Sequence, residues 1–461
     1  MNTSVASYID KLFEGYEAEL KRLVDIKSVR TEAQDGYPFG KGPAEALDEA
    51  EKIVNAHGFS MTNCEYYAGE VNLGENPDMM LLAHLDVVPE GDGWTREPYN
   101  MTREGDLLYG RGTTDDKGAA LAMIYAMDAV KSVLGEPKTG VRLVLGCGEE
   151  TGSEDMEYYF KKRPGLKYTL SPDAEYPLIN IEKGRYSPTF TKKIAKTDKN
   201  IRIKKINGGV TQNIVPGKAS AVISGVSDTE IAKICSDAEK KTGVGFTIEP
   251  TADGVKISAS GQTAHASTPD LGNNAQTALI EVLYEFDTDL KSELEFLKKT
   301  FPHGETDGAS LGVKLSDKES GDLTLNFGVM HFDGETLTVN FDARCPVTAD
   351  DGRVFDRANS VFEEAGYTSD RAVPTKAHVV GKDSEIVKES LAVYEEFTGE
   401  KAEPIAIGGG TYVHEIPGGI AFGIEFPGRD YHIHGADEFA DINEMKMTAK
   451  MYAELMIKLI Y

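Results

Sequence analysis

Apolar residues recur at helical spacing at the start of the chain, and short unbroken apolar runs follow them. Ile9, Phe13, Tyr16, Leu20 and Leu23 share one face of an amphipathic helix. Helices are expected over 6–28, 43–57 and 118–134. Runs that are too short for helices predict buried strands over 79–83, 141–147 and 168–170. Such alternation favours an α/β domain with a mixed, mostly parallel sheet that helices flank.

The pattern changes near residue 181, where apolar and polar residues begin to alternate in short stretches. This alternation is typical of half-exposed antiparallel strands, which predict a separate α+β domain. Strands are expected over 220–224 and 336–343, and helices over 228–242 and 274–286. Helical patterning returns near Ser384, with a last buried strand over 420–426 and a last helix over 445–460. The α/β domain is therefore expected over 1–180 and 377–461, and the insertion at 181–376 has room for two α+β subdomains.

Composition narrows the classes of partner. The 461 residues carry a net charge of −27, from 49 basic and 76 acidic side chains. This balance argues against nucleic acid and against anionic membrane surfaces as partners. No apolar run approaches the roughly 18 residues of a membrane span, and the first 20 residues lack the apolar core of a signal peptide. Scattered cysteines without a CxxC pair favour a reduced, cytoplasmic protein.

Clustered histidine, aspartate and glutamate residues follow the predicted strands of the α/β domain. In an open sheet of this kind, the carboxyl ends of the strands line the ligand crevice. Five such segments would bring several carboxylates and two imidazoles to one place. The segments contain His84 and Asp86; Asp115 and Asp116; Glu149 and Glu150; Asp173; and His434 with Glu438.

The expected crowding of carboxylates is an electrostatic problem. Asp115, Glu149, Glu150 and Asp173 would each raise the pKa of the others and oppose folding. Two divalent cations would offset this repulsion. Mixed histidine and carboxylate ligands suit zinc, with manganese or cobalt as alternatives. The residues themselves therefore predict a site for two metal ions.

Each segment taken alone has an ordinary structural explanation. His84 fits a hydrogen-bonded core histidine, and Asp115 with Asp116 fits the amino end of a helix, where carboxylates cap free N–H groups. Glu149 and Glu150 fit a surface loop. Their joint occurrence at successive strand ends favours a site.

Two motifs resemble those of the aminoacylase/carboxypeptidase-G type family of dinuclear metallopeptidases. The stretch LAHLDVVP at 82–89 resembles the first metal motif of that family, and GRGTTDDKG at 110–118 resembles the second. NIVP at 213–216 and GGGTY at 408–412 resemble the bacterial dipeptidase (peptidase V-like) branch. The resemblance implies a zinc-peptidase-like catalytic domain, with the insertion as a lid.

The resemblance also implies which residues bind each metal ion. Asp115 would bridge the two ions, through a cis peptide bond to Asp116. His84 and Asp173 would complete one coordination sphere, and Glu150 and His434 the other. Each ion would then have one imidazole, one terminal carboxylate and a share of Asp115.

Further roles come from the same resemblance. Glu149 would act as the general base on a water molecule, and Asp86 would hydrogen-bond the His84 ring. The last motif departs from the family, because Asp437 stands where asparagine is usual. His432 is an alternative ligand to His434, which the spacing to Glu438 favours.

The insertion carries its own candidates by resemblance. His265, in GQTAHAS at 261–267, would stabilise an oxyanion, and Arg344 would bind a substrate carboxylate through its guanidinium fork. The alternative for Arg344 is a surface salt bridge of little energetic value. Asn213 would hydrogen-bond the same carboxylate or the carbonyl, and Gly409 would let the backbone approach a small substrate.

Together these features predict a dipeptidase that hydrolyses small peptides with a free carboxyl terminus. The alternative is an N-acyl-amino-acid amidohydrolase or desuccinylase of the same family, and a non-catalytic binding protein ranks last because Glu149 is retained. Many relatives dimerise through the lid, and the partner's lid then supplies the histidine. The long insertion at 181–376 favours a monomer instead.

Overall fold

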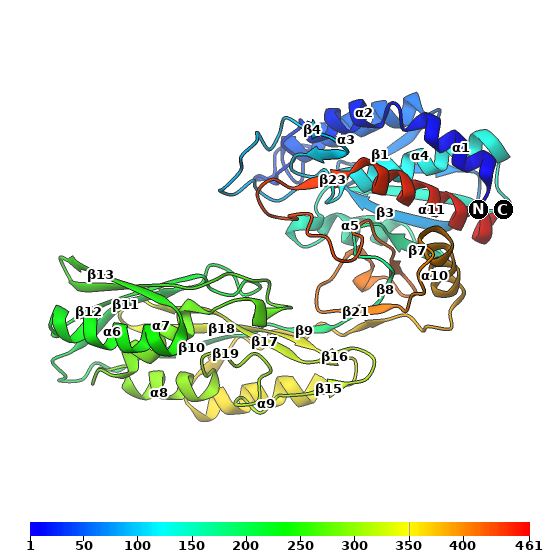
Figure 1. Cartoon of the computed structure of the whole chain (residues 1–461). Helices are drawn as coiled ribbons and strands as arrows, with labels where there is room; N and C mark the ends of the chain where they lie inside the picture. The colour runs from blue at the N-terminus through cyan, green and yellow to red at the C-terminus, as the bar shows by residue number, and fades with distance from the viewer. Residues whose placement is uncertain (350) are drawn as a thin grey trace. The chain divides into compact units, whose positions relative to one another are not determined.

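The computed structural model describes residues 1–349 and 351–461 as two compact units (Figure 1). The first unit comprises Met1–Ile181, Val379–Ile405 and Gly410–Tyr461. The second unit comprises Glu182–His378 and Ala406–Gly409. The chain thus leaves the first unit twice, for the long insertion and for the short segment Ala406–Gly409, and returns to it each time. Each unit has its own hydrophobic core.

The sheet of the first unit has parallel pairs at its centre and antiparallel pairs on both sides of them. Its strand order is β1-β2-β6-β3-β7-β22-β8-β20, and β21 also pairs with β8. Strand β3 is parallel to β6 and β7, and β22 is parallel to β7, whereas β2 is antiparallel to β1 and β6. The predicted mixed α/β sheet is confirmed. The strands are β1 (Met61–Cys64), β2 (Ala68–Leu73), β3 (Pro77–His84), β6 (Gly140–Gly146), β7 (Tyr168–Ser171), β8 (Ile179–Glu182), β20 (His378–Val379), β21 (Ile405–Ile407) and β22 (Ile420–Ala421).

Strand β3 shows why the central strands have unbroken apolar sequences. Met79 and Leu81 face the main core of the first unit, and Met80 and Leu82 face a second cluster on the opposite side of the sheet. Because successive side chains point to opposite faces, burial on both faces requires every position to be apolar. The strand ends at His84, which is also fully buried.

Helices cover both faces of this sheet. The helices α1, α4 and α11 pack against one another, and α5 packs near β2. The helical elements are α1 (Thr3–Leu12), α2 (Tyr16–Val24), α3 (Lys41–Ala56), α4 (Lys117–Leu134), α5 (Glu154–Lys162), α10 (Glu385–Thr398) and α11 (Ile442–Ile460), with short 3-10 turns η1 (Glu149–Thr151) and η3 (Tyr412–Glu415). A small separate sheet contains β4 (Thr102–Glu104), β5 (Leu107–Tyr109) and β23 (Phe439–Asp441).

Two expected elements of the first unit are shorter than predicted. The single helix over 6–28 is wrong: it divides into α1 and α2 at Gly15, a residue that costs about 1 kcal/mol inside a helix. The strand expected over 420–426 is limited to β22. Gly423 lies so close to the Ala174 carbonyl oxygen that a Cβ atom would be 1.6 Å from it. The segment after β22 therefore leaves regular strand geometry.

His57 joins the carboxylates of two helices in the first unit. Its Nδ1 lies 2.7 Å from Asp128 Oδ2 on α4, and its Nε2 lies 3.1 Å from Glu19 Oε2 on α2. Burial alone would lower the pKa of this imidazole, but the hydrogen bonds to the two carboxylates raise the pKa of His57 to about 9. The protonated ring therefore stabilises the fold.

We expect the free energy of unfolding to fall as pH rises from about 6.5 to about 9. The folded pKa of His57 exceeds its ordinary value, so this stabilisation is complete below 6.5 and is lost as pH passes through 9. The loss is roughly 3 kcal/mol, to order of magnitude, because each pKa unit corresponds to about 1.4 kcal/mol. Urea denaturation at several pH values measures it. His57→Gln is the control, and an equally steep decline in that variant would contradict the assignment.

The second unit is an α+β layer built on an antiparallel sheet of order β13-β14-β12-β11-β17-β18-β10-β19, with β9 paired to β18. Alternate residues of β12 are buried, as its sequence predicts. The strands are β9 (Gly184–Tyr186), β10 (Thr189–Lys193), β11 (Arg202–Gly208), β12 (Lys218–Ser224), β13 (Gly245–Thr251), β14 (Gly254–Ser260), β17 (Thr324–Phe332), β18 (Thr336–Cys345) and β19 (Thr368–Ser369), beside a hairpin of β15 (Ser316–Asp317) and β16 (Gly321–Asp322).

Helices of the second unit are distributed along this sheet. Helix α7 contacts β12 and β14, α6 contacts β13, and α9 contacts β19. The elements are α6 (Asp228–Thr242), α7 (Ala275–Tyr284), α8 (Lys291–Thr300), α9 (Asp351–Glu364) and the 3-10 turn η2 (Pro269–Leu271). One hydrophobic cluster extends through the unit. The division of this insertion into two subdomains stays a prediction.

Candidate metal centre

The predicted ligands of the first unit lie together around Asp115. His84 Nε2 is 3.0 Å from Asp115 Oδ1 and 3.6 Å from Asp173 Oδ2. On the other side, His434 Nε2 is 2.9 Å from Asp115 Oδ2 and 3.1 Å from Glu150 Oε2. Each oxygen of one carboxylate thus faces a different imidazole. This arrangement suits a carboxylate that is shared by two metal ions.

The sheet explains why residues so far apart in sequence converge. His84 ends β3, Glu149 and Glu150 form the turn η1 after β6, and Asp173 follows β7. These three strands are neighbours and run parallel, so their carboxyl ends lie at one edge. Asp115 comes just before α4, which packs on β3.

Two buried atoms support cation binding independently of the sequence motifs. His84 Nε2 and Asp115 Oδ1 are both buried, and within the described residues neither has a hydrogen-bond partner of acceptable geometry. Buried polar atoms without partners are costly, whereas a shared cation would satisfy both. The ligand atoms of His84, Asp115 and Glu150 lie within 4.8 Å of one another, as do those of His84, Glu149 and Asp173. The donor set of nitrogen and oxygen atoms fits divalent transition metals.

The electrostatics of the centre also favour cations. Burial, reinforced by neighbouring carboxylates, raises the pKa of Glu149 and of Asp173, and raises the pKa of Glu150 to about 7. Burial opposes ionisation of Asp115 as well, but the adjacent imidazoles of His434 and His84 hold its pKa below the usual range. Positive charge at the centre would stabilise all four carboxylates in their ionised form.

Asp86 supports the centre from behind. Its backbone carbonyl is 3.0 Å from His84 Nδ1, whereas its carboxylate Oδ1 is 3.4 Å from that nitrogen. The carboxylate instead accepts the backbone N–H groups of Glu149 and Glu150, each at 3.2 Å. Asp86 therefore orients the imidazole mainly through its main chain and fixes the turn that carries the two glutamates.

Asp116 and the last motif bear on two of the alternatives. Asp116 is buried, and its side chain makes no helix-capping hydrogen bond but accepts the His84 N–H at 3.0 Å. The peptide bond between Asp115 and Asp116 is cis. In the last motif both histidines are exposed, but the His432 ring packs against Phe439, and the Asp437 carboxylate accepts hydrogen bonds from Thr95. His434 is the residue that faces the cluster.

Two buried carboxylates that hold the loops of the centre were missed by the sequence analysis. Glu438 accepts the N–H groups of residues 112, 114 and 115 and pairs with Arg111 at 2.6 Å. Asp155 accepts the N–H groups of residues 147 and 148 and the hydroxyl of Tyr412. Glu438 stood within a noted motif, but Asp155 lies on α5, where acidic residues are common, so no local signal marks it.

The predicted residues of the insertion gather within the second unit. The N–H of Ala266, next to His265, donates to the Asn213 carbonyl at 2.8 Å, and His265 Nδ1 is 2.6 Å from Ser267 Oγ. Gly408 packs closely on Ser267: a Cβ atom added to Gly408 would lie 2.8 Å from Ser267 Cβ. Gly409, which was predicted to let the backbone approach a substrate, is the adjacent residue in the sequence.

Arg344 belongs to the same gathering. It is buried, donates to the Asp342 carboxylate and donates to the Gly408 carbonyl. The alternative of a weak surface salt bridge is therefore wrong, because the guanidinium is enclosed and held at two points. Such fixed placement suits recognition of a carboxylate.

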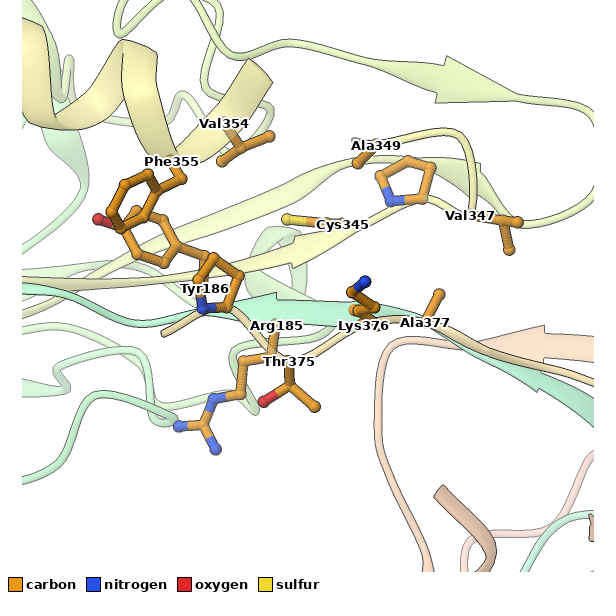
Figure 2. Close-up of a pocket in the computed structure, with 13 residues that line it drawn as sticks. Arg185, Tyr186, Cys345, Val347, Ala349, Val354, Phe355, Thr375, Lys376 and Ala377 are labelled. Atoms are coloured by element: carbon orange, nitrogen blue, oxygen red, sulfur yellow. The ribbon is translucent and has the colours of Figure 1, made fainter. Parts of the chain in front are cut away.

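A pocket of about 370 Å³ in the second unit is separate from these residues (Figure 2). Tyr186, Cys345 and Phe355 line it together with Arg185 and Lys376. None of the predicted site residues is part of its lining. The pocket therefore lies outside the set of candidate site residues.

Comparisons with known proteins agree on one family. The model of "Peptidase family M20/M25/M40" matches residues 80–458. The chain is 33% identical over 450 residues to the putative dipeptidase YtjP of Bacillus subtilis, covering 96% of each chain. It is also 33% identical over 453 residues to the Beta-Ala-Xaa dipeptidase of Lactobacillus delbrueckii subsp. lactis, covering 96% of this chain and 95% of that protein.

A solved structure shows the same fold at low sequence identity. Human carnosine dipeptidase 1 superposes with a TM-score of 0.58 at 15% identity, and the match covers 98% of each chain. At this identity the likeness concerns the fold alone. No helix in the described part of the chain is long and apolar enough to cross a bilayer.

Proposed function

Because the chain belongs to peptidase family M20/M25/M40, we propose that it is a two-metal dipeptidase that hydrolyses dipeptides with a free C-terminal carboxylate. The observation that carries the proposal is the position of Asp115 between His84 and His434, with a different oxygen facing each ring. The names of the two relatives at 33% identity support the substrate class.

We assign the two cation positions to His84 with Asp173 and to Glu150 with His434, with Asp115 shared. When bound, two divalent cations supply a Lewis acid for the scissile carbonyl and lower the pKa of water toward neutrality. Zinc suits this donor set, and manganese or cobalt are the alternatives.

Glu149 is the general base in this proposal. The backbone N–H of Glu149 donates a hydrogen bond to Asp86, and the Glu149 carboxylate lies near the ligand atoms of His84 and Asp173. From there it takes a proton from the attacking water and delivers it to the departing amino group. Asp86 positions the base and the His84 ring and does not itself react.

In the insertion, His265 donates a hydrogen bond to the developing oxyanion, and Arg344 binds the terminal carboxylate of the substrate. Asn213 and Gly409 complete the contacts to the peptide backbone. Two hydrogen bonds support a shared role: the N–H beside His265 donates to the Asn213 carbonyl, and Arg344 donates to the carbonyl of the residue before Gly409. The close packing of Gly408 on Ser267 brings these two pairs of segments together.

We further propose that the enzyme works as a monomer in the cytoplasm. The insertion at 181–376 is long enough to replace a partner's lid, and the four cysteines are buried and free, as in a reducing compartment. Light scattering tests the monomer directly: it should give a mass near 50.1 kDa, and a mass of about twice that value would contradict it.

The proposed function is tested by an activity screen with added zinc or manganese. We expect hydrolysis of dipeptides, including β-alanyl dipeptides as one arm of the screen, and little hydrolysis of tripeptides. Activity confined to N-acyl amino acids would replace the proposal with an amidohydrolase of the same family. Absence of any hydrolysis by metal-loaded protein would contradict both.

A further inference from the structure

One carboxylate beside the metal centre, that of Glu425, has no part in the ligand set. Glu425 follows β22 in the segment that Gly423 takes out of regular strand geometry. Its backbone is bonded to the chain that follows Asp173: Glu425 N–H donates to the Ala174 carbonyl at 3.1 Å, and Tyr176 N–H donates to the Glu425 carbonyl at 2.8 Å. These bonds fix Glu425 next to a predicted ligand loop.

The side chain of Glu425 is half-buried and interacts electrostatically with Asp173, Asp115 and His434. Across the described chain, no group donates a hydrogen bond to its carboxylate, and no cationic side chain lies within ion-pair distance. The carboxylates of Asp173, Glu175 and Asp115 all act on it electrostatically, and its partial burial limits its contact with water. An anion in this position is therefore unfavourable unless a cation accompanies it.

The two metal ions do not account for Glu425. It belongs to neither group of ligand atoms that lie within 4.8 Å of one another. Asp115, Glu149, Glu150 and Asp173 already balance the charge of two divalent cations. Glu425 then remains as an uncompensated negative charge at the rim of the centre, where the substrate binds.

A dipeptide brings one further cation to this place. Its α-ammonium group is one carbon atom away from the scissile carbonyl, so it must lie near the centre when that carbonyl is positioned for attack. A carboxylate is the group that pairs with an ammonium ion through charge-assisted hydrogen bonds. An N-acyl amino acid has no cation here and would leave Glu425 buried without a partner.

We infer that Glu425 binds the α-ammonium group of the substrate and selects peptides with a free amino terminus over N-acyl amino acids. This inference rests on the proposed function. Glu425 is a specificity-determining residue in this view. Its carboxylate contributes through binding, and the proton transfers remain with Glu149.

The test compares Ala-Leu with propionyl-Leu, which differ only in the ammonium group. Metal-loaded, full-length enzyme should cleave Ala-Leu with much the higher kcat/KM. Glu425→Gln keeps the shape and should lower kcat/KM for Ala-Leu by about 30-fold or more, because one partner of an enclosed charge pair is lost. It should leave kcat/KM for propionyl-Leu unchanged or raise it. Glu175→Gln is the matched control, since the exposed Glu175 is the bridge partner of Glu425 and should not alter the preference.

The outcomes separate this inference from the proposed function. Equal losses on both substrates in Glu425→Gln, or a drop in its measured zinc content, would show a structural or metal-binding role and overturn the inference. Wild-type enzyme that cleaves both substrates equally well would also overturn it, without need of any variant. Wild-type enzyme that cleaves neither would remove the proposed function, and the inference with it.

Discussion

Glu149→Gln is expected to lower kcat by about 10²–10⁴-fold or more while the protein keeps both metal ions. Glutamine has the shape of glutamate but cannot accept the proton of the attacking water. The backbone N–H of residue 149 would still donate to Asp86, so the turn η1 should hold its geometry. Steady-state kinetics on a dipeptide and elemental analysis of the same sample measure the two quantities.

Glu150→Gln serves as the comparison for this prediction. Glu150 lies 3.1 Å from His434 Nε2 and is a proposed ligand, so its variant should lose metal as well as activity. Adjacent glutamates would then give different results for a physical reason. If Glu149→Gln kept more than about a tenth of wild-type turnover, well short of the loss of a general base, another residue would have to take the proton.

His434→Ala should reduce the bound metal from about two ions per chain to about one and abolish most of the activity. The imidazole faces both Asp115 and Glu150, and its removal leaves that position with carboxylates alone. Loss of a residue that only supports a ligand costs 10–100-fold in metal affinity, so loss of a ligand should cost more than about 100-fold. Titration with zinc, followed by calorimetry, measures the affinity and the stoichiometry.

His432→Ala is the matched control, because the same side chain is removed two residues away. His432 is exposed and packs its ring against Phe439. It should keep two metal ions and nearly full activity. The opposite result, with metal lost from His432→Ala and retained in His434→Ala, would mean that the last motif is assigned to the wrong histidine.

Local sequence patterns were sufficient for the architecture of the first unit and for the location of the centre. The apolar runs of β3, β6 and β7 identify strands buried on both faces. The residues after them were expected to converge, because parallel neighbouring strands end at one edge of a sheet. His84, Glu149 and Asp173 could therefore be grouped without coordinates, whereas Asp115 precedes α4 and follows no strand of this sheet.

The limits of prediction lie where a residue's role depends on a distant segment. The break between α1 and α2 at Gly15 was not predicted, and neither was the early end of β22. The end of β22 reflects contact of Gly423 with Ala174, which is far away in sequence. The roles of Glu438 and Asp155 were not predicted for the same reason, because each carboxylate accepts a hydrogen bond from a residue far away in the sequence. A periodic pattern reports which face of an element is buried, but it does not report what that face meets.

The sequence by itself determined the residue types of the candidate centre: a crowded set of carboxylates and imidazoles whose charges favour bound cations. The tertiary structure alone decided how that set is arranged. It places one oxygen of Asp115 toward His84 and the other toward His434, and it turns the Asp86 carboxylate to the backbone of η1. It also leaves Glu425 without a partner. These features are set by side-chain directions and by contacts between segments that are separate in the sequence, which no local spacing encodes.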